Sequence, residues 1–254
     1  MNLYGLIGKT LKHSFSKQYF TEKFQRENIA DSQYELYELA SADQVKSLIK
    51  NNPDLRGLNV TIPYKQDIFS LVDSLDMHSA GKIGAVNTIK IFRDGTTKGY
   101  NSDYYGFRQS LEGWLRNVNY ESAGLSALVL GTGGASKAVV VALQDMNIPC
   151  QWVSRNKSEN TLAYNELDKS VIDEHKLIIN TTPLGMYPNI DECPPIPYEM
   201  LTSAHLLYDL VYNPLETKFM TMGKENGAQV MNGLEMLYMQ AEKSWEIWNL
   251  PETE

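Results

Sequence analysis

The segment Ala127-Leu-Val-Leu-Gly-Thr-Gly-Gly-Ala-Ser136 carries the clearest structural signal in the chain. Its first four residues are apolar and predict a buried strand, and helically spaced apolar residues after it predict a helix. Gly131 permits a tight turn between the two, and Gly133 omits a side chain where a pyrophosphate would approach the backbone. The helix N-terminus adds free N–H groups and the positive end of its dipole. This order predicts a Rossmann-like dinucleotide-binding unit, although Ser136 replaces the third glycine of the usual pattern.

Short apolar runs on both sides of this segment predict an α/β protein. After it, strands are expected at 151–154, 177–180 and 206–211, which suits a mainly parallel sheet. Before it, strands are expected at 3–7, 34–39 and 58–62, followed by a hairpin of 85–92 and 96–100 around Asp94-Gly95, so this part mixes parallel and antiparallel pairing. Ser41-Ala-Asp-Gln44 resembles a capping box at the start of another helix.

The last predicted helix runs from Leu234 to about Trp248, and we expect it to pack back on the first part of the chain. The prediction is therefore an N-terminal substrate-binding and catalytic α/β domain with a mixed sheet, made of residues 1–103 and 233–254. A Rossmann-like NADP-binding domain of residues 104–232 is inserted in it.

Composition and charge exclude several classes of function. The formal net charge of −8 and the pI near 5.1 argue against nucleic acid and against an anionic membrane surface, because both are bound through clustered Lys and Arg. Cys150 and Cys193 lie outside any CxxC pair, and the first residues show no basic region followed by an apolar run, so we expect a cytoplasmic protein. No metal site is predicted, since the histidines lack metal-ligand spacing; they are His13, His78, His175 and His205.

The end of the strand at 151–154 indicates which nicotinamide cofactor fits. NAD sites usually carry an acid there to bind the ribose 2′-hydroxyl, and this chain has none. Arg155 and Lys157 can instead pair with a 2′-phosphate, which favours NADP over NAD. The alternative is that Arg155 is a solvent-exposed arginine of the loop with no role in cofactor binding.

Lys65 and Asp103 are the candidate proton-transfer residues. Lys65 follows a predicted strand, where an ammonium could protonate an alkoxide as a carbonyl is reduced. A carboxylate at Asp103 that faces Lys65 would hold the ammonium and share its proton. Taken singly, each residue also fits a structural role: Lys65 as a surface lysine, and Asp103 as an acidic residue at the start of a helix, where the helix dipole favours it. The polar residues at the surrounding strand ends favour a ligand site; they are Asn59, Thr61, Asn87, Thr88, Asn101 and Ser102.

Ser14 and Ser16 present two hydroxyls on one face of an extended segment. They suit a substrate carboxylate, or one of them caps the helix that follows. With the glycine turn, these residues predict an enzyme that moves a hydride between a nicotinamide cofactor and a small carbonyl or alcohol substrate. A hydrolase has no support, because the sequence has no Gly-x-Ser-x-Gly elbow.

Taken together, widely spaced motifs in a fixed order resemble the shikimate dehydrogenase family from residue 4 to about residue 245. They are Gly8-Lys-Thr-Leu-Lys-His-Ser-Phe-Ser16, Gly57-Leu-Asn-Val-Thr-Ile-Pro-Tyr-Lys65, Gly84-Ala-Val-Asn-Thr88, Asn101-Ser-Asp103, Gly131-Thr-Gly-Gly-Ala135, Asn180-Thr-Thr-Pro-Leu-Gly-Met186, Tyr208-Asp-Leu-Val-Tyr-Asn-Pro214, and Asn232-Gly-Leu234 with Gln240.

The resemblance implies reversible NADPH-dependent reduction of 3-dehydroshikimate to shikimate in chorismate and aromatic amino acid biosynthesis, with Lys65 and Asp103 as the catalytic pair. The substrate-binding residues it implies are Ser14, Ser16 and Tyr212 for the carboxylate, and Thr61, Asn87 and Gln240 for the ring hydroxyls. The cofactor-binding residues it implies are Gly131, Thr132, Gly133, Gly134 and Ala135 for the pyrophosphate, Ser154 and Arg155 for the adenosine ribose and its phosphate, and Leu210 and Gly233 for the nicotinamide. The family's second arginine in the stretch 154–159 is missing here, and Lys157 is the candidate to compensate.

Three alternatives stay open at this stage. They are a quinate/shikimate dehydrogenase that prefers NAD, a folate-type methylene dehydrogenase of related layout, and a non-catalytic paralogue that senses the ligand. The two serine hydroxyls and the Lys65/Asp103 pair favour the hydroxy-acid dehydrogenase. The oligomeric state is not fixed by the sequence, and a homodimer is compatible with it.

Overall fold

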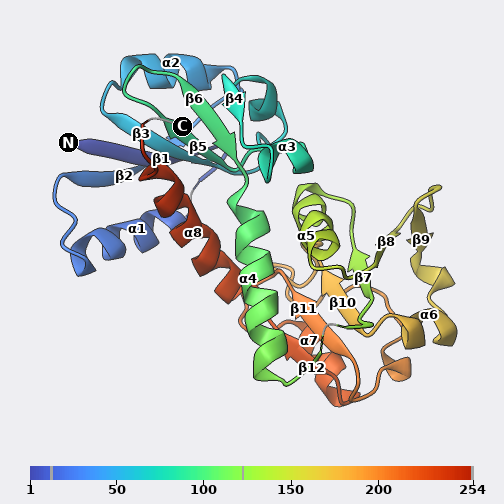
Figure 1. Cartoon of the computed structure of the whole chain (residues 1–254). Coiled ribbons are helices and arrows are strands. Elements are labelled where there is room, and N and C mark those ends of the chain that lie inside the picture. The colour runs from blue at the N-terminus through green and yellow to red at the C-terminus, as the bar shows by residue number, and fades with distance from the viewer. Residues whose placement is uncertain (12–13, 122, 253–254) are drawn as a thin grey trace. The chain divides into compact units, whose positions relative to one another are not determined.

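The computed structural model describes residues 1–11, 14–121 and 123–252 of the chain. It divides the chain into two compact units: unit 1 is Met1–Ser102 with Ala241–Glu254, and unit 2 is Asp103–Gln240. Each unit is built around its own sheet, as Figure 1 shows, and this confirms the predicted α/β class. Helix α8 (Leu234–Trp248) begins in unit 2 and ends in unit 1.

In unit 1, strands alternate with helices along the chain, and the last two strands, at 88–91 and 97–100, form an antiparallel hairpin. Its strands are β1 (Asn2–Gly8), β2 (Ser32–Glu38), β3 (Leu55–Val60), β4 (Ser74–Leu75), β5 (Thr88–Ile91) and β6 (Thr97–Tyr100). Its helices are α1 (Phe15–Arg26), α2 (Gln44–Asn51), the 3-10 turn η1 (Asp67–Ser70), α3 (Ala80–Ile83) and the last part of α8. The predicted hairpin is confirmed, with Gly95 at φ 87° in its turn, a conformation that glycine adopts without strain.

The strand order of unit 1 brings the polar strand ends to one edge of the sheet. The order is β2-β1-β3-β5-β6-β4; β1 runs parallel to β2 and β3, and β5 runs antiparallel to β3 and β6. Asn59 near the end of β3 therefore pairs with Thr88 at the start of β5, and Thr88 also pairs with Tyr100 at the end of β6. Residues that follow β1, β3 and β6, or precede β5, meet at this edge.

Aromatic side chains fill the face of this sheet that α1 and α8 cover. Tyr4 stacks on Trp248 at a ring-centroid distance of 4.9 Å, and Phe20 stacks on Tyr34 at 4.7 Å. Gly57 in β3 leaves room for Trp248, because a side chain there would overlap the indole ring. The indole Nε1 donates to the Ile89 carbonyl at 3.1 Å, so the end of α8 is an integral part of unit 1.

Unit 2 is a fully parallel sheet with helices on both faces. Its strands are β7 (Ala127–Leu130), β8 (Cys150–Ser154), β9 (Thr161–Ala163), β10 (Leu177–Asn180), β11 (Leu206–Asp209) and β12 (Gln229–Met231). Its helices are α4 (Ser102–Asn117), α5 (Gly134–Asp145), α6 (Lys169–Glu174), α7 (Lys218–Glu225), the first part of α8, and the 3-10 turns η2 (Tyr164–Glu166) and η3 (Tyr198–Met200).

The strand order of unit 2 is β12-β11-β10-β7-β8-β9, with every neighbouring pair parallel. The chain winds outward from β7 to one side and then returns to β10 on the other. Between β7 and β10 lies the topological switch point, where doubly wound sheets bind ligands beyond the carboxyl ends of their strands. The glycine turn follows β7 directly, so it lies at this point.

Two details of local structure differ from the sequence predictions. The predicted capping box is wrong. Helix α2 begins at Gln44, and Gln44 Oε1 accepts a hydrogen bond from the Ala40 N–H at 2.8 Å instead of from the Ser41 N–H, as a capping box would require. The strands β4, β9 and β12 were not predicted. They contain two or three residues each and lie at or next to sheet edges, where no long apolar run is needed.

Candidate active site

Ser14 has a buried hydroxyl that no described residue satisfies. It is the N-cap residue of α1, yet its side chain makes no capping hydrogen bond, and its Oγ has no hydrogen-bond partner among the residues described. The capping alternative is therefore wrong for Ser14. Buried polar atoms are nearly always paired, so an unpaired hydroxyl at a strand-end cluster indicates a place for a ligand acceptor.

Ser16 is connected to the centre of unit 1 through Tyr34. The Ser16 side chain lies near the Tyr34 phenol, and the phenol donates to Asn59 Oδ1 at 2.8 Å. Burial raises the pKa of Tyr34 well above its ordinary value, so this tyrosine stays neutral and can donate. Asn59 Nδ2 in turn donates to Ser244 Oγ of α8 at 2.8 Å. A continuous polar path thus runs from the start of α1 to the last part of α8.

Asn87 anchors the beginning of α4. Its Oδ1 accepts from the Ser102 N–H at 2.6 Å, and its Nδ2 donates to Ser102 Oγ at 3.1 Å. Asp103 is the next residue along the chain and lies in the first turn of α4. The backbone of Val86 donates to the Lys65 carbonyl at 2.7 Å, so the segment that holds Lys65 is tied to the segment that holds Asn87.

Thr61 follows the end of β3 and completes the group of predicted substrate residues in unit 1. Its N–H donates to the Ile7 carbonyl of β1 at 2.9 Å, and its methyl group packs close to Gly8. The structure thus brings Ser14, Ser16, Thr61, Lys65 and Asn87 to one edge of one sheet.

The glycine turn after β7 leaves open space at the start of α5. Gly131 has φ 104°, and a side chain there would press on Thr182 Cγ2 at 2.9 Å. Gly133 is the N-cap of α5, and a Cβ at Gly133 or Gly134 would meet open space within 4 Å. Ser136 is buried and donates to the Gly133 carbonyl at 2.7 Å, so this residue stabilises the turn without a glycine. The residues therefore fit a pyrophosphate at the N-terminus of α5.

The loop after β8 carries the two cations that the sequence predicts for a 2′-phosphate, Arg155 and Lys157. Arg155 is exposed and forms no ion pair with the residues described. Lys157, the candidate to compensate for the missing second arginine, forms an ion pair with Glu166. Glu166 also accepts from the Ala163 N–H at 2.9 Å and is thereby fixed beside Lys157.

Leu210 and Gly233 lie against each other at the ends of β11 and β12. A side chain on Gly233 would overlap the Leu210 carbonyl, so only glycine fits. Tyr212 follows two residues after Leu210, and burial raises the pKa of its phenol, which keeps it protonated. Gln240 lies on α8, where its Nε2 donates to the Leu237 carbonyl at 3.1 Å.

Sequence reasoning missed Asp209, the last residue of β11. Its side chain is fully buried, and burial raises the pKa of the carboxyl group to about 6. Asn180, Val211 and Thr217 donate hydrogen bonds to it. The available signal was an acid directly after three apolar strand residues, in the motif Tyr208-Asp-Leu-Val-Tyr-Asn-Pro214.

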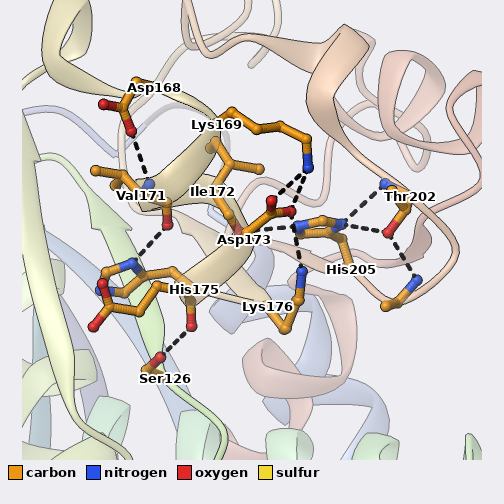
Figure 2. Close-up of polar contacts among 12 residues, drawn as sticks. Ser126, Asp168, Lys169, Val171, Ile172, Asp173, His175, Lys176, Thr202 and His205 are labelled. Atoms are coloured by element: carbon orange, nitrogen blue, oxygen red, sulfur yellow. Dashed lines mark hydrogen bonds and ion pairs between the residues drawn. The ribbon is translucent and has the colours of Figure 1, made fainter.

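Two of the described histidines, His175 and His205, form hydrogen bonds with nearby backbone groups, and His78 is exposed. Figure 2 shows His205 between the turn at Thr202 and the end of α6: its Nδ1 accepts from the Thr202 N–H at 2.9 Å, and its Nε2 donates to the Ile172 carbonyl at 3.0 Å. His175 Nδ1 bonds the Val171 carbonyl at 2.8 Å, while His13 lies outside the described residues. Across residues 1–11, 14–121 and 123–252, no group of three or more His, Cys, Asp or Glu is arranged to hold a metal ion.

Within the same ranges, every helix is too short or too polar to cross a bilayer. Cys150 and Cys193 are both free thiols.

Comparison with known proteins identifies relatives along nearly the whole chain. The family model for the shikimate dehydrogenase substrate binding domain matches residues 6–89. The shikimate dehydrogenase (NADP(+)) of Clostridium perfringens is 40% identical over 262 residues, covering 98% of this chain and 93% of the relative.

Solved structures agree with this match. A shikimate dehydrogenase in complex with NADP+ is 31% identical, with a TM-score of 0.83 over 98% of this chain and 90% of the other. A quinate dehydrogenase from Corynebacterium glutamicum in complex with NAD is 26% identical, with a TM-score of 0.85 over 99% and 94%. The resemblance noted in the sequence is confirmed: the chain belongs to the shikimate dehydrogenase family.

Proposed function

We propose that this chain catalyses the reversible NADPH-dependent reduction of 3-dehydroshikimate to shikimate, a step toward chorismate and the aromatic amino acids. Membership of the family and the names of its relatives support the reaction and the cofactor. The observation in this chain that carries the proposal is the buried Ser14 hydroxyl, which has no hydrogen-bond partner within residues 1–11, 14–121 and 123–252 and lies in the segment that matches the substrate binding domain. A substrate carboxylate would accept its hydrogen bond.

The substrate is held by hydroxyl and amide groups. Ser14 and Ser16 donate to its carboxylate, and the neutral phenol of Tyr212 adds a third donor. The ring hydroxyls are bound by Thr61, Asn87 and Gln240. Asn87 suits this role because Ser102 fixes the orientation of its amide.

Lys65 and Asp103 carry out the proton transfer. In the reduction, the Lys65 ammonium donates a proton to the alkoxide oxygen that forms at C3, and in the reverse direction the lysine takes it back. Asp103 accepts a hydrogen bond from Lys65 and orients it. Proton transfer by a positioned side chain typically contributes roughly 10²–10⁴-fold to the rate.

The residues that would hold NADPH lie in unit 2, and the cofactor, when bound, supplies the hydride. The turn of Gly131, Thr132, Gly133, Gly134 and Ala135 binds the pyrophosphate through backbone N–H groups. Ser154 and Arg155 bind the adenosine ribose and its 2′-phosphate. Leu210 and Gly233 form the wall against the nicotinamide ring.

One observation favours a second candidate, a quinate/shikimate dehydrogenase that accepts NAD. Lys157 is paired with Glu166, which leaves Arg155 as the main attraction for a 2′-phosphate. A site with a single arginine discriminates less against a cofactor that lacks this phosphate.

A panel of substrates and cofactors tests the proposal. Shikimate or quinate is offered with NADP+ or NAD+, and reduced cofactor is followed by its near-ultraviolet absorbance. We expect the highest kcat/KM for shikimate with NADP+. Higher values for quinate with NAD+ would support the second candidate, and no turnover with bound ligand would support the non-catalytic paralogue.

The variant Lys65→Ala serves as the chemical control in this panel. We expect kcat to fall roughly 10²–10⁴-fold while the Kd for shikimate changes much less. Lys46→Ala, which removes an exposed lysine of α2, should keep wild-type kcat. A kcat for Lys65→Ala within a small factor of wild type would contradict the role given to Lys65.

The proposal includes a cytoplasmic location, which free thiols and an acidic surface support. A homodimer stays a prediction, and light scattering of the purified protein checks it.

A further inference from the structure

Asp209 holds a position that no proposed binding role explains. It lies at the carboxyl end of β11 with a fully buried side chain, and both carboxylate oxygens are occupied. Oδ1 accepts from Asn180 Nδ2 at 2.9 Å and from the Val211 N–H at 3.0 Å, and Oδ2 accepts from Thr217 Oγ1 at 2.6 Å. These donors are neutral, so the charge is balanced by hydrogen bonds alone.

One branch of this network leads to the glycine turn. Asn180, held by Asp209 through its Nδ2, accepts on Oδ1 from the Thr182 N–H at 3.0 Å and the Thr182 hydroxyl at 2.7 Å. The Thr182 methyl lies where a side chain of Gly131 would be, 2.9 Å from the ideal Cβ position. Thr181 also donates to the Leu130 carbonyl at 2.7 Å, so the loop after β10 supports the turn after β7.

The other branch leads to the segment around Leu210. Asp209 Oδ1 fixes the Val211 N–H, and the Leu210 N–H donates to the Asn180 carbonyl at 2.9 Å. The Val211 carbonyl in turn accepts from the Gly233 N–H at 3.2 Å. The backbone that abuts Gly233 is therefore set by the same carboxylate.

We propose that Asp209 is a positioning residue for the dinucleotide: through Asn180 and through the backbone of residues 210–211, it fixes two of the three segments of unit 2 that are proposed to bind the cofactor, the glycine turn and the segment around Leu210. The inference rests on the proposed function for the identity of the cofactor. It adds a residue that touches neither substrate nor cofactor and acts only through its neighbours.

The chemistry of the group explains why a carboxylate is used. Burying an ionised carboxylate is costly unless hydrogen bonds compensate, and two acceptor oxygens can serve three donors at once. An alanine leaves those donors unpaired. An asparagine keeps one acceptor oxygen for Asn180 and Val211, and its new N–H can donate to the Thr217 hydroxyl.

Titration of NADP+ into Asp209 variants by calorimetry tests the proposal. We expect Asp209→Ala to weaken NADP+ binding roughly 10- to 100-fold, because buried donors lose their acceptor. Asp209→Asn should retain affinity within about fivefold, because it preserves most of the hydrogen bonds. In the free protein, hydrogen exchange should speed up at residues 181–184 and 210–212 in Asp209→Ala and stay near wild type in Asp209→Asn.

Thr217→Val is the second variant, and it covers the case in which Asp209→Ala fails to fold. It keeps the side-chain shape and removes both the donor to Asp209 and the N-cap acceptor for the Met220 N–H of α7, at a residue that lies outside the proposed cofactor contacts. We expect NADP+ binding to weaken about three- to tenfold. Ile172→Ala is the matched control: it opens a cavity in the core of unit 2 without removing a side chain of this hydrogen-bond network, and should lower thermal stability with little change in Kd.

The pH dependence of binding separates positioning from a general loss of stability. The pKa of Asp209 is raised to about 6 by burial, so the carboxyl gains a proton below that pH and one acceptor is lost. The other titratable group coupled to it among the described residues is Tyr198, whose raised pKa keeps it neutral. Wild-type affinity should therefore fall more steeply from about pH 7 to about pH 5 than that of Asp209→Asn. The 2′-phosphate of NADP+ titrates in the same range, but equally in both proteins.

The outcomes distinguish this inference from the proposed function. Wild-type Kd values in folded Asp209→Ala and Thr217→Val would overturn the positioning role, whatever the substrate panel gives. A wild-type protein that binds NADP+ without oxidising shikimate would overturn the proposed reaction and leave the positioning role standing if the variants lose affinity.

Discussion

At the scale of single residues, the site combines side chains that are satisfied with one that is not. Asn59 and Asn87 have hydrogen-bond partners within unit 1, whereas the buried Ser14 hydroxyl has none among the residues that the structure describes. An unpaired buried hydroxyl costs stability in the free protein, and a ligand that accepts its hydrogen bond recovers that cost.

Ser14→Ala should therefore separate binding from stability. We expect the KM for shikimate to rise roughly 10-fold, since a hydrogen bond to a charged group is lost, while Tm stays equal or rises slightly. Steady-state kinetics and a thermal scan check this. In Ser16→Ala, which also removes a polar neighbour of the buried Tyr34 phenol, we expect KM to rise and Tm to fall. An unchanged KM in Ser14→Ala would mean that the hydroxyl does not meet the substrate.

Arg155 should determine the preference for the phosphorylated cofactor. We expect Arg155→Ala to raise the KM for NADP+ about 10- to 100-fold, because a charge-assisted hydrogen bond contributes on the order of 1.5–3 kcal/mol, and to leave the KM for NAD+ nearly unchanged. Kinetics with each cofactor measure both values. Glu166→Gln frees Lys157 from its ion pair and should lower the KM for NADP+. Equal losses with the two cofactors in Arg155→Ala would contradict the assignment.

At the scale of elements, the sequence predicted long apolar strands and well-spaced helices correctly and missed what depends on tertiary contacts. The strand at 127–130 and the helix after it were clear, because both are buried and flanked by glycine. The edge strands β4, β9 and β12 exist because a neighbour offers free backbone groups, which no local pattern encodes. The network of Asp209 joins β10, β11 and α7, segments that become neighbours only after folding.

His205 connects two elements of unit 2 and should make stability depend on pH. Burial lowers its pKa, so the folded protein holds it neutral, with Nδ1 accepting and Nε2 donating as Figure 2 shows. Because the folded pKa is lower than the unfolded value near 6.5, its contribution is complete above about pH 6.5 and is lost as the pH falls toward the folded pKa.

The test is the thermal unfolding of His205→Gln, which can still donate to the Ile172 carbonyl. We expect its Tm to be lower than wild type near pH 7 and to fall less between about pH 7 and about pH 5. The exposed His78 provides the control, and His78→Gln should follow the wild-type curve. Parallel pH curves for wild type and His205→Gln would show that His205 does not titrate on unfolding.

At the scale of the whole molecule, two cores form from one chain, and α8 belongs to both units. Ser14, Ser16 and the glycine turn could be proposed as ligand-binding residues from the sequence alone, because each follows the end of a strand within its own unit. The polar path from Ser16 through Tyr34 and Asn59 to Ser244 could not be predicted from the sequence. Ser244 is distant in sequence from the other three residues and comes from α8, the helix that returns to unit 1.

Trp248→Ala should weaken unit 1 selectively. The indole is buried among aromatic rings and bonds the Ile89 carbonyl, and loss of a buried Trp or Phe typically costs about 3–5 kcal/mol. Hydrogen exchange read peptide by peptide should show faster exchange in β1 and β3 and near-native protection in β7 and β10. Trp114→Ala, which removes a ring packed on Tyr208 in unit 2, should give the opposite pattern. Equal losses in both units for either variant would mean that the cores unfold together.

The return of α8 to unit 1 has a consequence for how the protein is made. The strands of unit 1 leave the ribosome first, all of unit 2 follows, and only then does the segment that contains Trp248 emerge. At translation rates of roughly 5–20 residues per second, on the order of ten seconds pass between the synthesis of Tyr4, Phe20 and Tyr34 and that of Trp248, whose indole packs on their rings. The nascent chain therefore carries an uncovered aromatic surface while unit 2 is already free to fold.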